Sequence, residues 1–170
     1  MISACIKDCL TYPESYETIS TRIDSSRINV SKMEEIIELS KECAKLNDKI
    51  NSLNFKYDLT KAEKEELKLN LKQKLNENIS NLRSSVDNLY DKEINGWAVT
   101  HRFRCQNDYG AQMPPQEMVF FCDLNFERCQ GWTAKQIESF FKIIECVDES
   151  ETDNVFLNYL QDIRYIFNFL

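Results

Sequence analysis

The chain has 170 residues, of which only three are glycine and three are proline, and its formal net charge is −7 at neutral pH. This composition argues against a glycine-rich phosphate loop, a collagen-like repeat and a turn-dense β-sandwich. Hydrophobic residues make up 42% of the chain, so we expect a folded core. No segment is basic and no apolar run is long enough to cross a bilayer, so we expect neither a nucleic-acid partner nor a transmembrane span.

The first elements are predicted to be a short helix and a strand. Residues 2–11 carry one apolar stripe at helical spacing, and Pro13 ends the helix because proline cannot continue it. The stripe consists of Ile2, Cys5, Ile6, Cys9 and Leu10. Residues 17–23 then alternate β-branched and polar side chains, which predicts a strand.

Residues 32–93 contain neither glycine nor proline and predict a coiled-coil helical hairpin. Apolar residues follow an a/d heptad seam, which lapses near Asp58, and Thr60 with Glu63 forms a capping-box pattern that begins a second helix. The lapse and the cap favour an antiparallel hairpin within one chain over a continuous helix that dimerises in parallel. The seam residues expected to make the contact are Ile36, Leu39, Leu46, Ile50, Leu53, Leu75, Leu82 and Leu89.

The segment after Gly96 is predicted to form most of a sheet. Residues 97–105 show the cleanest alternation in the chain, and further strands are expected at 118–124 and 128–132. The loop at 106–116 carries Gly110 and two adjacent prolines.

The C-terminal region, residues 133–170, is predicted to form two helices. Thr133 and Gln136 give a second capping-box pattern, followed by a helix with an apolar face. An acidic linker at 148–153 precedes a last helix at 155–167. The apolar face of the first of these helices is expected to contain Ile137, Phe140, Phe141 and Ile144.

Together these elements predict an α+β fold. A short helix and an antiparallel sheet of three or four strands form a base from residues 1–31 and 94–132. The hairpin at 32–93 is an insertion, and the helical pair at 133–170 packs on the base.

Two groups of side chains are candidates for chemistry. His101 is the only histidine and shares a strand face with apolar residues, so a packed, hydrogen-bonded histidine is expected. A Cys–His hydrolase, a distant alternative, would need a cysteine across the sheet, and Cys122 is the best placed by strand order. Arg102 and Arg104 share the other face, where they form a solvated surface or, with Asn107 and Tyr109, bind a small anionic ligand. The residues that would bind this ligand are Arg102, Arg104, Asn107 and Tyr109.

Seven cysteines, an odd number with no CxxC pair, predict reduced thiols that are mostly buried. With one histidine, no zinc site of the usual spacing is visible, and we expect no metal, cofactor or catalytic residue. Reduced thiols predict a cytoplasmic protein. In contrast, Ile2-Ser3-Ala4-Cys5 looks like the end of a lipoprotein cleavage site, which would make Cys5 the lipid anchor of an envelope protein if the true start lies upstream.

Two segments together resemble a known family. Leu10 to Tyr16 resembles an L-x-x-P-x-S-Y segment, and Gly96 to Gly110 resembles a V-x-H-(K/R)-(F/Y)-R-x-x-N-x-(F/Y)-G strand and loop. The pair is similar to a small α+β domain of unassigned function found in bacterial exported or membrane-attached proteins. The resemblance implies a helix packed on a short antiparallel meander, with strand 17–23 paired to strand 97–105. It departs from the family at Tyr12 and Ala111 and in the length between the strands.

These observations predict a non-enzymatic protein–protein interaction or scaffold module. The helical hairpin is the expected contact surface, for another protein or for a second copy of the chain. Binding of a small anion at the Arg102 and Arg104 face is the alternative.

Overall fold

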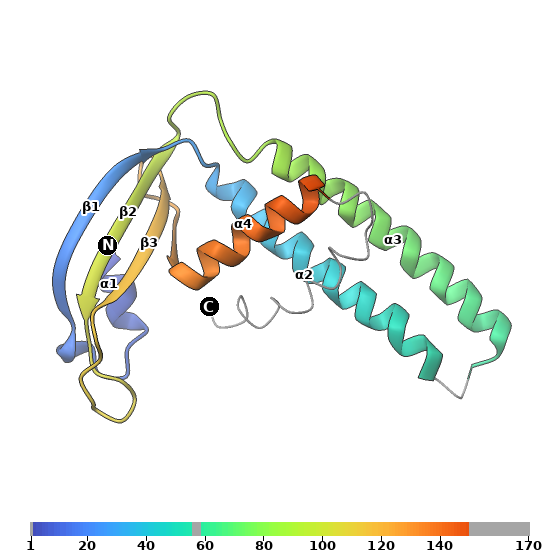
Figure 1. Cartoon of the computed structure of the whole chain (residues 1–170), viewed down its shortest axis with the longest axis horizontal. Coiled ribbons are helices and arrows are strands. Elements are labelled where there is room, and N and C mark those ends of the chain that lie inside the picture. The colour runs from blue at the N-terminus through green and yellow to red at the C-terminus, as the bar shows by residue number, and fades with distance from the viewer. Residues whose placement is uncertain (1, 56–58, 150–170) are drawn as a thin grey trace. The chain divides into compact units, whose positions relative to one another are not determined.

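The computed structural model describes residues 2–55 and 59–149 and has a mixed α+β fold (Figure 1). The chain divides into two compact units. The first, the sheet unit, consists of Met1–Val30 and Tyr90–Ile137. The second, the hairpin unit, consists of Ser31–Leu89 and the chain from Glu138 onward. The predicted α+β class is therefore confirmed.

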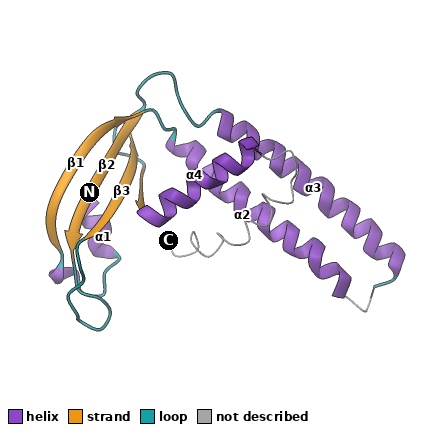
Figure 2. Ribbon diagram, in the orientation of Figure 1, coloured by secondary structure: helices purple, strands orange, loops and turns teal. Residues whose placement is uncertain are grey.

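The sheet unit is built on a four-stranded antiparallel meander (Figure 2). Its strands are β1 (Glu17–Ser26), β2 (Gly96–Arg104), β3 (Gln116–Asp123) and β4 (Cys129–Thr133), in that spatial order. The pairing of β1 with β2, which the family resemblance implied, is confirmed by a register that places Thr21 opposite His101 and Ile23 opposite Val99. The hairpin is thus an insertion between two neighbouring strands.

Helix α1 (Ile2–Asp8) covers one face of this sheet through Ile6. The core on that face joins Ile6 to Val99, Phe103, Cys105, Phe120 and Cys122. The predicted apolar stripe is only partly correct, because Cys5 and Cys9 are exposed. The helix has seven residues and so presents only about two turns to the sheet. A short 3-10 turn, Pro13–Ser15, follows it.

Helices α2 (Val30–Ser52) and α3 (Lys61–Asp87) form the two arms of the hairpin (Figure 1). The Asn78 side-chain amide donates a hydrogen bond of 3.1 Å to Glu42, and Ser85 is hydrogen-bonded to Glu35. From the first pair to the second, the position on α2 moves seven residues back, from Glu42 to Glu35, while the position on α3 moves seven residues forward, from Asn78 to Ser85. The two arms therefore run antiparallel. The predicted hairpin is confirmed, and the continuous dimeric coiled coil is not formed. Residues 56–58, where the turn was expected, lie outside the described residues, after the 3-10 turn Leu53–Phe55.

The predicted seam is sealed inside the chain. Its residues are buried, apart from Leu39, which is half-buried, and the free thiol of Cys43 lies in the same core. The capping box at the start of α3 is also confirmed. The Thr60 backbone N–H donates to Glu63 Oε2 over 2.8 Å, and the Glu63 N–H donates to Thr60 Oγ1 over 3.3 Å. The Thr60 hydroxyl also donates to this carboxylate, and these bonds lower the pKa of Glu63.

Helix α4 (Ala134–Glu149) begins at the second predicted capping box, which is confirmed. The Thr133 N–H donates to Gln136 Oε1 over 2.8 Å, and the Gln136 N–H donates back to Thr133 Oγ1 over 3.3 Å. Its buried apolar side chains differ from the predicted face. They are Phe140, Ile143 and Val147, whereas Ile137, Phe141 and Ile144 are half-buried.

The described part of the predicted C-terminal helical pair is helix α4, which the division into units splits after Ile137. The described residues from Glu138 onward belong to the hairpin unit. The predicted linker at 148–153 falls largely outside the described residues, and the predicted last helix at 155–167 lies entirely outside them. In the described part of the chain, the helices are too short or too polar to cross a membrane.

Candidate functional site

His101 lies in the middle of β2 and is almost completely buried. Both ring nitrogens have hydrogen-bond partners: the Tyr16 hydroxyl lies 2.5 Å from Nε2, and Thr21 Oγ1 lies 2.7 Å from Nδ1. The Tyr16 hydroxyl also bonds to Ser3 of α1 and Thr18 of β1. Burial lowers the pKa of His101, so the ring is neutral at pH 7. The histidine is packed and hydrogen-bonded, as predicted, and through Tyr16 it ties the chain around α1 to the sheet.

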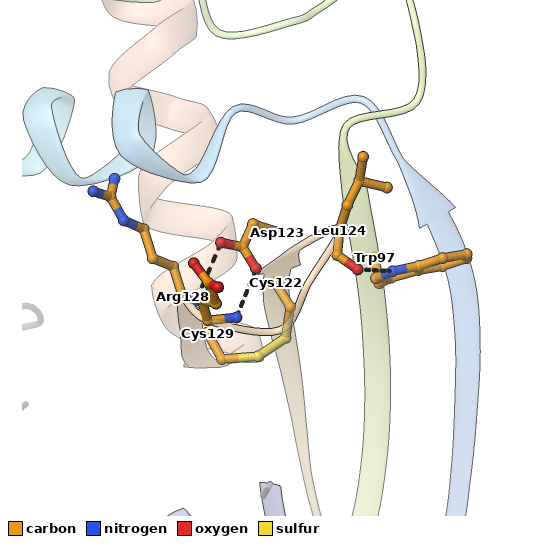
Figure 3. The surroundings of a disulfide bond; sticks show 7 residues. Trp97, Cys122, Asp123, Leu124, Arg128 and Cys129 are labelled. Atoms are coloured by element: carbon orange, nitrogen blue, oxygen red, sulfur yellow. Dashed lines mark hydrogen bonds between the residues drawn. A yellow bond between two sulfur atoms is a disulfide. The ribbon is translucent and has the colours of Figure 1, made fainter.

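The hypothetical Cys–His pair is not formed. Residue Cys122 lies opposite Trp97 in the β2–β3 register, and the residue opposite His101 is Met118. Moreover, Cys122 is joined to Cys129 in a disulfide, with a Cα–Cα distance of 4.2 Å (Figure 3). A sulfur held in a disulfide has no thiolate to act as a nucleophile. The hydrolase alternative therefore lacks its reactive group.

The disulfide also corrects the prediction that all seven thiols are reduced. Residues Cys122 and Cys129 are direct cross-strand neighbours in the β3–β4 hairpin, which brings their side chains to one face. Neither the odd cysteine count nor the missing CxxC pattern indicated this. The strand register is the signal that would have found it, and the sequence did not reveal that register.

The turn closed by this disulfide is braced by Asp123 (Figure 3). Its carboxylate accepts hydrogen bonds from the backbone N–H groups of Glu127, over 2.8 Å, and Arg128, over 3.3 Å. Within the turn Phe126 has a φ of 59°, which is rare for a bulky residue, and its ring stacks on Trp97 at 6.3 Å between centroids. The Trp97 indole N–H donates to the carbonyl of Leu124 over 3.3 Å. The disulfide, the carboxylate and the stacking all brace this turn.

The two arginines predicted to bind an anion lie on the exposed face of the sheet. Arg102 Nε is 3.7 Å from Glu117 Oε2, and Arg104 lies opposite Glu17 in the β1–β2 register. Each arginine thus has an acidic neighbour, which favours a solvated face of mixed charge. Asn107, in contrast, accepts hydrogen bonds from the backbone of Tyr109 and Ala111 and shapes the loop, while Tyr109 is 93% exposed. The two arginines share one face of β2, and the side-chain oxygen of Asn107 is engaged by its own loop.

An open cavity of about 510 Å³ lies beside this loop, within the sheet unit. Its lining includes Leu10, Phe103, Met113 and Met118, and the thiol of Cys105. Burial raises the pKa of that thiol, so Cys105 is protonated and unreactive at neutral pH. Polar groups line the cavity as well, namely Gln106, Asn107, Asp108, Gln116, Glu117, Thr133 and Lys135. It has the size of a small-molecule site but contains no activated nucleophile. In the described ranges 2–55 and 59–149, no three His, Cys, Asp or Glu side chains cluster to hold a metal ion.

The hairpin has an end that is not covered. We call residues 61–74 of α3, together with Phe55, the hairpin end. No side chain in residues 61–74 is buried, whereas Leu75 and the apolar residues after it are. Phe55 is 72% exposed, Leu67 is 41% exposed and Leu69 is 69% exposed. Because Leu67 and Leu69 are two positions apart, they point to different sides of the helix, so the exposed apolar surface extends beyond the seam.

No protein-family model, curated protein or solved structure matches the chain. The family resemblance carried by residues 10–16 and 96–110 therefore stays a prediction. The fold that it implied is present nonetheless, since helix α1 packs on a four-stranded antiparallel meander.

Proposed function

We propose that the protein is a non-enzymatic interaction module whose hairpin end binds a protein partner. The observation that supports this most directly is the burial along α3. Residues 61–74 span about four helical turns without burying a side chain. Helices in water gain most of their stability from packing an apolar face. A helical segment that has exposed leucines and no fully buried side chain is what a partner would cover.

The composition of the hairpin end indicates the chemistry of that partner. Lys64, Lys68 and Lys72 recur every four residues and form a basic row next to Leu67 and Leu71. Within these rows Leu67 and Lys72 are exposed, whereas Lys64, Lys68 and Leu71 are half-buried. A protein with an apolar groove bordered by acidic residues fits both rows. The seam residues do not take part, because they are already used inside the chain.

Site-specific photo-cross-linking in the native cells tests this proposal. A photoreactive amino acid at Leu69 should give one discrete cross-linked product, since the residue lies in the proposed contact. The matched control places the same group at Asn81, an exposed polar residue of α3 that lies outside the hairpin end. A Leu67→Gln substitution should weaken the product formed from position 69. Equal labelling from both positions, or no product from either, would contradict the proposal.

We further propose that the protein works in an oxidising compartment, rather than in the cytoplasm as the expected reduced thiols suggested. The Cys122–Cys129 disulfide supports this, because such bonds persist mainly in secreted, periplasmic or cell-surface proteins. Thiol alkylation of freshly lysed native cells, followed by mass spectrometry, should find Cys122 and Cys129 unmodified until a reductant is added. Alkylation of both without reductant would contradict the proposal.

A further inference from the structure

Strand β1 lies at one edge of the sheet and is exposed over almost its whole length. Among the described strands, whose spatial order is β1-β2-β3-β4, it pairs only with β2, and nine of its ten residues are exposed. An edge strand presents a row of backbone N–H and C=O groups that another strand can pair with. This surface belongs to the sheet unit and is distinct from the hairpin end.

The regular part of β1 is limited on both sides. An irregularity in the β1–β2 register lies between Thr18 and Ser20, where the strand bulges, and the strand ends at Ser26. A bulge interrupts the regular hydrogen-bonding pattern of an edge. Residues 20–26 are therefore the stretch that can accept a new strand, and Ile23 is at its midpoint.

The side chains around Ile23 are complementary to the same side chains in a second copy of β1 that is related by a two-fold axis. If a second β1 pairs antiparallel with Ile23 on the axis, Arg22 lies opposite Asp24 of the copy, and Asp24 lies opposite Arg22 of the copy. The same register places Thr21 opposite Ser25 and Ser20 opposite Ser26, all hydroxyl side chains. Opposite charges directly across strands stabilise a pair, whereas like charges destabilise it.

Neighbouring registers do not share this property. Moving the axis to Arg22 places two arginines opposite each other, and moving it to Asp24 places two aspartates opposite each other. In the single chain Arg22 Nε lies 2.8 Å from Asp24 Oδ2, and their side chains are 75% and 53% exposed. Both charges are therefore available on one face. On the other face Ile23, which is 57% exposed, would meet Ile23 of the copy.

From these observations we propose that β1 pairs antiparallel with β1 of a second copy, with Ile23 on the two-fold axis. The two sheets then form one continuous eight-stranded antiparallel sheet. The occupant of the edge is thus a second copy of this chain, selected by the Arg22 and Asp24 pairs. Because these pairs are exposed, the dimer should weaken as salt concentration rises.

Charge exchange at the edge tests the proposal. The molar mass of the full chain is measured by sedimentation over a range of concentrations, and the native chain should be a dimer. Arg22→Asp and Asp24→Arg should each weaken the dimer by about 10-fold or more, since each replaces two attractive pairs with two repulsive ones. An equimolar mixture of the two variants should dimerise again, because each then supplies the charge that the other needs. The double variant with both changes should also dimerise.

Three results would overturn the proposal. They are a native chain that stays monomeric, a dimer that survives both single substitutions, and a mixture that does not associate. Arg22 and Asp24 are exposed, so both single variants should keep the native tryptophan fluorescence and circular dichroism.

If either variant does not fold, a disulfide cross-link provides the test, in a background with Cys5 and Cys9 changed to serine. Ile23→Cys should then form an intermolecular disulfide, whereas Thr21→Cys, which faces Ser25 of the copy, should not. Equal cross-linking at both positions would contradict the register.

Discussion

Removing the Cys122–Cys129 disulfide should lower the free energy of unfolding of the sheet unit. The two cysteines are separated by seven positions in the sequence, so the disulfide closes a short loop. For a loop of about eight residues, the loss of chain entropy in the unfolded state corresponds to about 2.5 kcal/mol. The change is a Cys122→Ala/Cys129→Ala double substitution. Because Cys122 is buried, the double variant should lose slightly more than this value.

The assay is guanidinium denaturation followed by tryptophan fluorescence. The chain has two tryptophans, Trp97 and Trp132, and both lie in the sheet unit. Trp97 stacks on Phe126 in the turn that the disulfide closes, and Trp132 is buried, so the signal reports on the sheet rather than on the hairpin. A Cys5→Ala variant, which removes an exposed free thiol, serves as the matched control and should unfold like the native chain.

A reducing agent separates the effect of the disulfide from that of the substitutions. It should lower the denaturation midpoint of the native chain and leave that of the double variant unchanged. If the reductant does not change the native midpoint, or if the double variant is as stable as the native chain, the disulfide does not stabilise the sheet in the way described.

Three further predictions concern the interior and turns of the sheet unit. Gly96→Ala should destabilise the protein by about 3 kcal/mol, because a Cβ there would collide with the backbone carbonyl of Cys122. Gly110→Ala should cost about 1 kcal/mol, because Gly110 has a φ of 76° but open space around it. Thermal melting of the two variants compares these costs. Tyr16→Phe should cost about 1–3 kcal/mol, since it leaves Nε2 of the buried His101 without its partner; a cost equal to that of an exposed Tyr109→Phe control would refute this. The free energy of unfolding should fall as the pH drops below about 6.5, because His101 is then protonated in the unfolded chain but not in the folded one. The fall should level off below the pKa of His101 in the folded chain, which burial lowers. A His101→Gln variant that keeps this slope in a series of denaturation measurements would show that another group causes it.

Much of the fold could be predicted from the sequence because local signals agreed with the packing. Two capping boxes, at Thr60 and Thr133, mark helix starts that the structure confirms, and the heptad spacing predicts which side chains the hairpin buries. The alternation of residues 97–105 likewise predicts β2 and the burial of His101. Each of these signals depends either on residues close together in the sequence or on the regular spacing of apolar residues along one helix or strand.

The features that the sequence did not predict depend on contacts across strands or between helices. The disulfide requires that Cys122 and Cys129 face each other, which only the β3–β4 register determines. The buried face of α4 is rotated from the predicted one because the surrounding packing, and not the count of apolar residues, selects Ile143 over Ile144. The hairpin end was missed for a related reason, since spacing along α3 does not show that Leu67 is exposed whereas Leu75 is buried.

Amide hydrogen exchange of the purified chain, resolved along α3, tests the central claim most directly. The claim is that the hairpin seals its seam within one chain and leaves its end uncovered for a partner. Segments with few buried contacts open locally at low free energy, so residues 61–74 should exchange much faster than residues 75–87 of the same helix. Equally slow exchange over both halves would show that the hairpin end is already covered, and would contradict its role as the contact surface.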